Sequence, residues 1–162
     1  MSERQRVDRR HSASRSASRL DEAATGALQD ALAAEHAALW SYGLAVAFLG
    51  PQQSARARED AAEHLRLRGA LETTLTQLGV RPVSAQPAYA TPQPVGDAAS
   101  AAVLAVVAET DALAAWRSVL ERTEDRGLRR AALDALVGGA LRCARWRAST
   151  DALPAVPVFP GR

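Results

Sequence analysis

Residues 28–49 read LQDALAAEHAALWSYGLAVAFL, and this stretch has the periodicity of a helix that packs inside a bundle. Steps of four and three residues alternate along it, which is the spacing of the buried seam in packed helices. The seam consists of Leu28, Leu32, Glu35, Leu39, Tyr42, Val46 and Leu49. Only Glu35 is charged, and a carboxylate in such a seam loses its hydration unless a proton, a cation or a metal compensates it. The partner of Glu35 is therefore the functional question that the sequence poses.

Three further helices follow from the periodicity and punctuation of the chain. Gly50-Pro51 ends the first helix, because glycine and proline are the usual residues after a helix C-terminus. Ser54 and Asp97 are the expected N-caps of the second and third helices, since their side chains can accept hydrogen bonds from free backbone N–H groups. We therefore expect helices over residues 25–49, 54–78, 97–122 and 128–150.

The connection between the second and third helices is long and predicts the topology. Residues 79–96 contain four prolines and cannot be helical throughout. Fully extended, such a connection reaches up to ~60 Å, enough to run the length of the bundle. The other two connections are short, so the helices that they join are antiparallel neighbours. One long crossover in the middle predicts an all-α, ferritin-like four-helix bundle.

The fourth helix and the tail after it contain the remaining apolar residues. In the fourth helix, the side chains expected to face the core are Leu133, Leu136, Val137, Ala140, Leu141 and Ala144. Gly138-Gly139 lies in mid-helix, where glycine is unfavourable, so we expect close helix approach or room for a bound group there. The proline-rich tail is expected to lie across the bundle, anchored by Val158 and Phe159.

Ionisable side chains occur at the middle of three helices, and so at one level of the bundle. They are Glu35, Glu63 with His64, and Glu109. Carboxylate-bridged metal sites in bundle cores are built in this way, but arginine or histidine partners would satisfy buried carboxylates equally well. Tyr42 follows Glu35 in the same seam, and Arg142 lies within one turn of the middle of the fourth helix, so both can donate hydrogen bonds to these carboxylates.

The chain resembles the ferritin-like superfamily and, within it, a ferritin-like family of unknown function from high-GC (actinobacterial) bacteria. The resemblance extends over residues 27–161 and rests on AEHAALWSYG, AAEHLRLRGAL, PAYATPQPVGDAASA, AAWRSVL, ALRCARWR and the terminal FPG. Ferritin-like di-iron proteins take one Glu from each of two helices and a Glu-x-x-His from each of the other two. By this resemblance, Glu35 and Glu109 match the two single glutamates.

The second and fourth helices depart from that di-iron pattern. Arg66, not His, follows Glu63 by three residues, and the fourth helix contains neither Glu nor His. We therefore expect a binding or structural protein without ferroxidase activity, catalytic residues or cofactor. Its predicted polar core consists of Glu35, Tyr42, His64, Glu109 and Arg142. The alternative is a di-iron or ferroxidase-type protein that binds iron or another divalent metal through Glu35, Glu63, His64 and Glu109.

Composition indicates the remaining properties of this chain of 162 residues. Residues 1–24 are rich in Arg and Ser and are expected to be a disordered tail, with residues 25–162 forming the bundle. The formal net charge is +2, but the chain after residue 20 has fourteen arginines and sixteen acids, so its charge does not favour nucleic-acid binding. A single cysteine, Cys143, and the lack of a long uninterrupted apolar run favour a cytoplasmic protein without membrane spans. A second apolar stripe in the first helix predicts a homodimer; it comprises Trp40, Leu44, Ala47 and Phe48.

Overall fold

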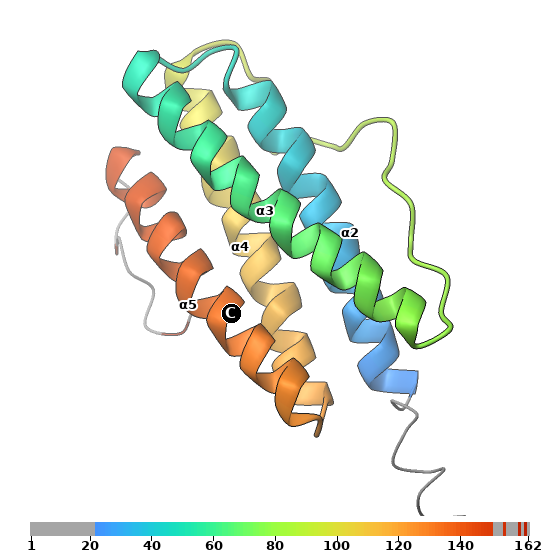
Figure 1. Ribbon diagram of the computed structural model, residues 1–162. Coiled ribbons are helices and arrows are strands. Elements are labelled where there is room, and N and C mark those ends of the chain that lie inside the picture. The colour runs from blue at the N-terminus through green and yellow to red at the C-terminus, as the bar shows by residue number, and fades with distance from the viewer. Residues whose placement is uncertain (1–21, 151–153, 155–158, 160, 162) are drawn as a thin grey trace, which may run out of the picture.

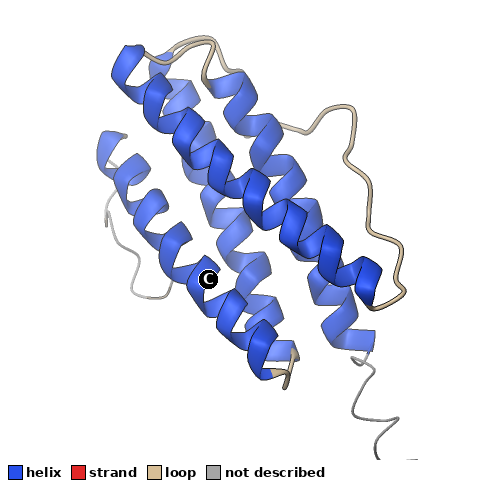
Figure 2. Ribbon diagram, viewed as in Figure 1, coloured by secondary structure: helices blue, strands red, loops and turns tan. Residues whose placement is uncertain are grey.

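The computed structural model describes residues 22–150 together with Pro154, Phe159 and Gly161, and it confirms the all-α fold (Figure 1). Four helices make up most of the described part of the chain, and no strand occurs in it (Figure 2). They are α2 (Glu22–Ala45), α3 (Pro51–Gln77), α4 (Ala98–Arg122) and α5 (Arg126–Ser149). The predicted tail lies outside the described residues up to position 21, whereas residues 22–24 belong to α2.

The four helices form a bundle in which α2 and α4 make the most extensive contact. α2 also packs against α3, and α4 against α5, whereas α3 and α5 contact each other weakly. α2 and α5 therefore occupy opposite corners of the bundle (Figure 1). By its length and apolar composition alone, α4 could also cross a membrane. In this structure, however, it packs between α2 and α5 and carries the buried Glu109 near its middle.

The crossover between α3 and α4 runs along α2, so α4 begins at the end of the bundle opposite to where α3 ends (Figure 1). The side-chain amide of Gln29 in α2 binds the crossover through both its nitrogen and its oxygen. Its Nε2 donates to the carbonyl of Arg81 at 2.8 Å, and its Oε1 accepts from the backbone N–H of Val83 at 2.8 Å. Farther along, the rings of Trp40 and Tyr89 pack with their centroids 5.9 Å apart.

The helix termini agree with the predicted caps in one case and differ in another. Asp97 caps α4 as predicted, and its carboxylate accepts from the backbone N–H of Ser100 at 2.8 Å. Ser54 does not cap α3, because that helix already begins at Pro51. Proline suits the first helical position, since its missing N–H would have no partner there. The Ser54 hydroxyl instead donates to the carbonyl of Leu49 at 2.9 Å.

The predicted core face of α5 is only partly right: Leu136 packs against the core, but three of the large apolar side chains are exposed. Leu133, Val137 and Leu141 are 47%, 56% and 60% exposed. The face that packs inward consists of Ala132, Ala135, Gly139, Arg142, Cys143 and Trp146. Both faces have steps of three and four residues, and apolar content alone favoured the wrong one.

The predicted anchors of the tail are only partly described by the structure. Phe159 is 60% exposed, and Val158 lies outside the described residues. Gly161 instead lies against α4, with its carbonyl accepting from Arg117 Nη1 at 3.3 Å. A β-carbon at Gly161 would lie 2.8 Å from the carbonyl oxygen of Leu113, so only glycine fits this contact.

Candidate polar core at mid-bundle

Polar side chains from all four helices meet at the centre of the bundle. The structure brings together the five residues of the predicted polar core, from α2 (Glu35, Tyr42), α3 (His64), α4 (Glu109) and α5 (Arg142). The first four are completely buried, and the Arg142 side chain is 8% exposed. The level at which they meet follows from the heptad seams of α2 and α4, which set Glu35 and Glu109 facing the core.

His64 lies between two carboxylates and contacts both. Its Nδ1 is 2.6 Å from Glu35 Oε2, and its Nε2 is 3.1 Å from Glu109 Oε1. Burial alone would lower the pKa of His64, but the hydrogen bonds to Glu109 and Glu35 outweigh it and raise the pKa to about 9. His64 is thus an imidazolium at neutral pH that donates one hydrogen bond to each carboxylate.

Glu109 is the acceptor on which this network converges. Its Oε1 accepts from Tyr42 Oη at 2.7 Å and from Arg142 Nε at 2.8 Å, in addition to His64. Burial would raise the pKa of Glu109, but His64 and Arg142 together hold it below its usual value. The other oxygen, Oε2, is buried, and no donor in the described part of the chain reaches it.

Gly138 and Gly139 shape the space in which Arg142 lies. A β-carbon at Gly138 would lie 3.4 Å from Arg142 Nη1, and one at Gly139 would lie 3.5 Å from Nη2. Leu113 of α4 also packs against Gly139, where a β-carbon would come within 3.0 Å of its Cδ2. The close helix approach that we expected at the glycine pair is therefore present, and the pair also leaves room for the guanidinium of Arg142.

A second polar cluster joins α3 to α5 one turn away. Asp60 accepts from the indole N–H of Trp146 at 2.9 Å and from Arg145 Nη2 at 3.1 Å. Burial raises the pKa of Asp60, while the hydrogen bond from Trp146 opposes that shift. These contacts form a polar bridge where α3 and α5 otherwise pack weakly.

Glu63 does not join the central network, although the predicted metal site included it. Its carboxylate forms two hydrogen bonds with Arg66 on the outside of α3, at 2.9 and 2.6 Å. The Glu63 side chain is 38% exposed. The physical reason is helix geometry, because adjacent residues point about 100° apart and His64 already occupies the inward position.

Two tryptophans of the polar clusters were not among the predicted polar residues. Trp116 donates its indole N–H to Glu35 Oε1 at 2.6 Å, and Trp146 binds Asp60 in the same way. A buried indole N–H usually needs an acceptor, so the presence of Trp116 in the seam of α4 was a usable signal. The contact between Trp146 and Asp60 had a weaker signal in the sequence, because the predicted inward face of α5 did not include Trp146.

His36 and Cys143 are buried outside the central network. His36 is mostly buried, and its Nε2 lies 3.2 Å from the carbonyl oxygen of Val83 in the crossover. Cys143 is buried beside Thr110, and burial raises the pKa of its thiol, which disfavours the reactive thiolate.

Four charged side chains lie at the centre of this network. Two carboxylates, Glu35 and Glu109, face two cations, His64 and Arg142, so the buried charges balance. Both nitrogens of His64 are already engaged, and its ring separates the two carboxylates. Accordingly, no group of three or more His, Cys, Asp or Glu side chains within residues 22–150 is arranged to hold a metal ion.

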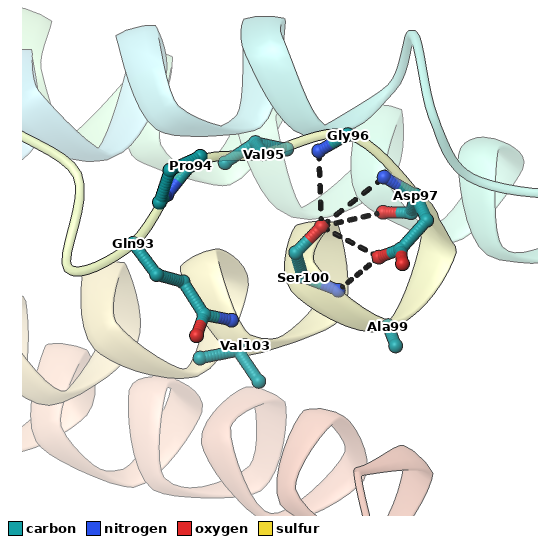
Figure 3. Close-up of a pocket in the computed structure, with 8 residues that line it drawn as sticks. All are labelled: Gln93, Pro94, Val95, Gly96, Asp97, Ala99, Ser100 and Val103. Carbon is teal, nitrogen blue, oxygen red and sulfur yellow. Dashed lines mark hydrogen bonds between the residues drawn. The ribbon is translucent and has the colours of Figure 1, made fainter.

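A shallow surface hollow lies beside the start of α4, away from this network (Figure 3). It is lined by Gln93, Pro94, Val95, Gly96, Asp97, Ala99, Ser100 and Val103. The Ser100 hydroxyl is hydrogen-bonded to Asp97 and Gly96, as the dashed lines in Figure 3 show. These polar groups already serve as the cap of α4, so the polar core remains the stronger candidate site.

Known proteins resemble this chain in fold and, in one case, clearly in sequence. A conserved hypothetical protein, rv2844, from Mycobacterium tuberculosis has 36% sequence identity and a TM-score of 0.77, with 85% of this chain and 97% of that one covered. A ferritin-like, diiron-carboxylate protein from Bacillus anthracis str. Ames has a TM-score of 0.54 at 13% identity, with 79% of this chain and 90% of that one covered. This second likeness shows a ferritin-like bundle fold alone.

No curated protein matches the sequence. The family described as Domain of unknown function (DUF4439) matches it over residues 27–162, which is most of its length. The sequence match covers all four helices except the first turn of α2, as well as the central polar network. The chain therefore belongs to the DUF4439 family.

Proposed function

We propose that this chain is a ferritin-like bundle without ferroxidase activity, which acts as a binding or structural protein rather than as a di-iron enzyme. The observation that carries the proposal is the charge balance at mid-bundle. His64 and Arg142 supply the positive charge that Glu35 and Glu109 require, through contacts of 2.6 to 3.1 Å. In a di-iron bundle, the metal ions would supply this charge.

The side chains that could serve as metal ligands also do not match those of a di-iron site. A di-iron bundle takes a Glu-x-x-His from each of two helices. The buried pair with this spacing on α5 is Gly139 and Arg142, a residue without a side chain and a permanent cation. On α3, the residue three positions before His64 is Ala61. The residues present therefore do not fit a di-iron centre.

Metal binding is the direct test. Protein purified without chelators is analysed for bound metals, then titrated with ferrous iron without oxygen, and finally exposed to oxygen. We expect no stoichiometric iron and no oxidation faster than that of iron in buffer. Thermal midpoints measured with and without Fe²⁺, Mn²⁺ or Zn²⁺ provide a second readout, because a ligand that binds only the folded state raises the midpoint.

Binding of two ferrous ions per chain, followed by oxygen-dependent oxidation, would overturn the proposal. In that case, Glu109→Gln should abolish the oxidation, whereas Glu63→Gln would show whether the exposed carboxylate moves inward to bind metal. A thermal midpoint that rises with one of the three metals would also contradict it.

A further inference from the structure

The outward face of α5 carries an apolar stripe that the bundle does not cover. Leu133, Val137 and Leu141 follow one another at steps of four residues and are 47–60% exposed. Residues at this spacing lie on one face of a helix. An exposed apolar stripe of this kind marks an interaction surface more often than isolated exposed residues do.

The charges of α5 point to an acidic partner. The helix contains six arginines and a single acid, Asp134. Carboxylates compensate three of the arginines, since Arg142 pairs with Glu109, Arg145 with Asp60 and Arg130 with Asp134. The surplus positive charge comes from Arg126, Arg129 and Arg147. Two α5 helices of neighbouring copies would bring these charges together, which disfavours a symmetric α5–α5 contact.

The outward face of α2 carries negative charge and small apolar side chains, which complement the α5 stripe. Of the four described helices, α2 alone contains no arginine. His64 compensates Glu35, which leaves Glu22 and Asp30 exposed and without an ion pair among the described residues. Ala33, Ala37 and Leu44 lie on the same side as Asp30, and Phe48 is exposed just beyond the helix end. Small residues such as Ala33 allow another helix to approach closely.

We propose that a second copy of this chain docks its α5 stripe on the outward face of α2. The contact joins Leu133, Val137 and Leu141 of one copy to the alanine-rich face around Ala33 of the next. Opposite charge flanks the two apolar stripes, which favours this pairing over α5 with α5. The α2 face shares Leu44 and Phe48 with the predicted homodimer surface, but it leaves out Trp40, whose ring packs against Tyr89 of the crossover.

Such a contact is head-to-tail. α2 and α5 lie at opposite corners of the bundle, so after two copies have bound, one copy keeps a free α2 face and the other keeps a free α5 face (Figure 1). A contact between two different surfaces does not stop at a dimer but continues to a chain or a ring. The expected assembly therefore grows beyond two copies.

The test uses the full chain at low salt, with mass measured by light scattering and sedimentation over a wide concentration range. We expect the average mass to rise with concentration past that of a dimer and to fall when salt is added. Two variants disable one face each: Val137→Ser with Leu141→Ser on α5, and Ala33→Arg on α2. Leu65→Asp is the matched control, because Leu65 is 48% exposed on α3 and belongs to neither face. Circular dichroism confirms that each variant is folded.

Mixing the two disabled variants is the decisive measurement. Each variant alone should remain a monomer, whereas an equimolar mixture should form a one-to-one dimer that does not grow, since each partner retains the face that the other needs. Leu65→Asp should assemble like the unmodified chain. A mass that stops at a dimer, a monomer at every concentration, or a mixture that stays monomeric would each overturn the proposal.

Discussion

At the scale of the residue, Arg142 is the side chain that α5 contributes to the polar core. Its Nε lies 2.8 Å from Glu109 Oε1, and the guanidinium is almost completely buried. Arg142→Met retains most of the volume but leaves the Glu109 charge with fewer partners. We expect the free energy of unfolding to fall by about 3–5 kcal/mol, as is usual when a buried ion pair loses one member. Chemical denaturation measures this loss.

The control for Arg142→Met is Arg130→Met, since Arg130 forms an exposed pair with Asp134. Exposed pairs of this kind contribute less than about 1 kcal/mol. Adding Glu109→Gln to Arg142→Met should recover part of the lost stability, because the amide carries no charge. Equal losses for the two arginines would contradict a special role of Arg142.

His64 should make stability depend on pH in the alkaline range. Its pKa is about 9 in the folded chain. The ordinary value of about 6.5 applies after unfolding. The folded state therefore retains the proton more strongly, so the stabilisation is complete below about pH 6.5 and disappears as the pH rises through 9. The expected loss is on the order of 3 kcal/mol.

Denaturation at several pH values between 6 and 10 follows this loss. His64→Gln should be less stable at neutral pH and should lack most of the slope between about pH 7 and 9. An unchanged slope in His64→Gln would assign the titration to another group, and the charge balance proposed for the core would then be wrong.

At the scale of the element, Gly139 determines how closely α4 and α5 approach. Alanine in place of glycine normally stabilises a helix by about 1 kcal/mol. At Gly139, however, the added β-carbon would come within 3.0 Å of Leu113 Cδ2 and would also touch Arg142. We expect Gly139→Ala to lower the thermal midpoint.

Gly69→Ala is the matched control within α3, because nothing lies within 4 Å of the position that its β-carbon would occupy. It should raise stability by roughly 0.5–1 kcal/mol. If both substitutions stabilise, then Leu113 and Arg142 yield to the new methyl group, and the tight α4–α5 contact is not a constraint.

At the scale of the whole molecule, the boundary of the folded unit can be tested by truncation. Residues 1–20 contain six arginines and no apolar period, and the described bundle begins at Glu22. Deleting residues 1–21 should therefore leave the thermal midpoint unchanged within a few degrees. Deleting residues 1–28 also removes Ala24, Ala27 and Leu28, which are buried, and should lower the midpoint strongly. A large fall after the shorter deletion would mean that the first residues stabilise the bundle.

The sequence alone determined the class of fold and the level of the polar core. Heptad seams, the Asp97 cap and the proline-rich crossover are local signals, because each depends on residues that are close along the chain. They were sufficient to predict four helices, one long connection, and Glu35, His64 and Glu109 at a common height.

Only the tertiary structure decided which face of α5 turns inward and which groups satisfy the core. Two stripes of α5 have helical spacing, and the more apolar one, with Leu133 and Val137, lies outside. The inner one is selected because Gly139 fits against Leu113 and Arg142 reaches Glu109. Such a choice depends on the sum of contacts with other helices, and no periodicity within one helix encodes that sum. The same reason explains why Glu63 turned outward and why the indole N–H of Trp116 donates to Glu35.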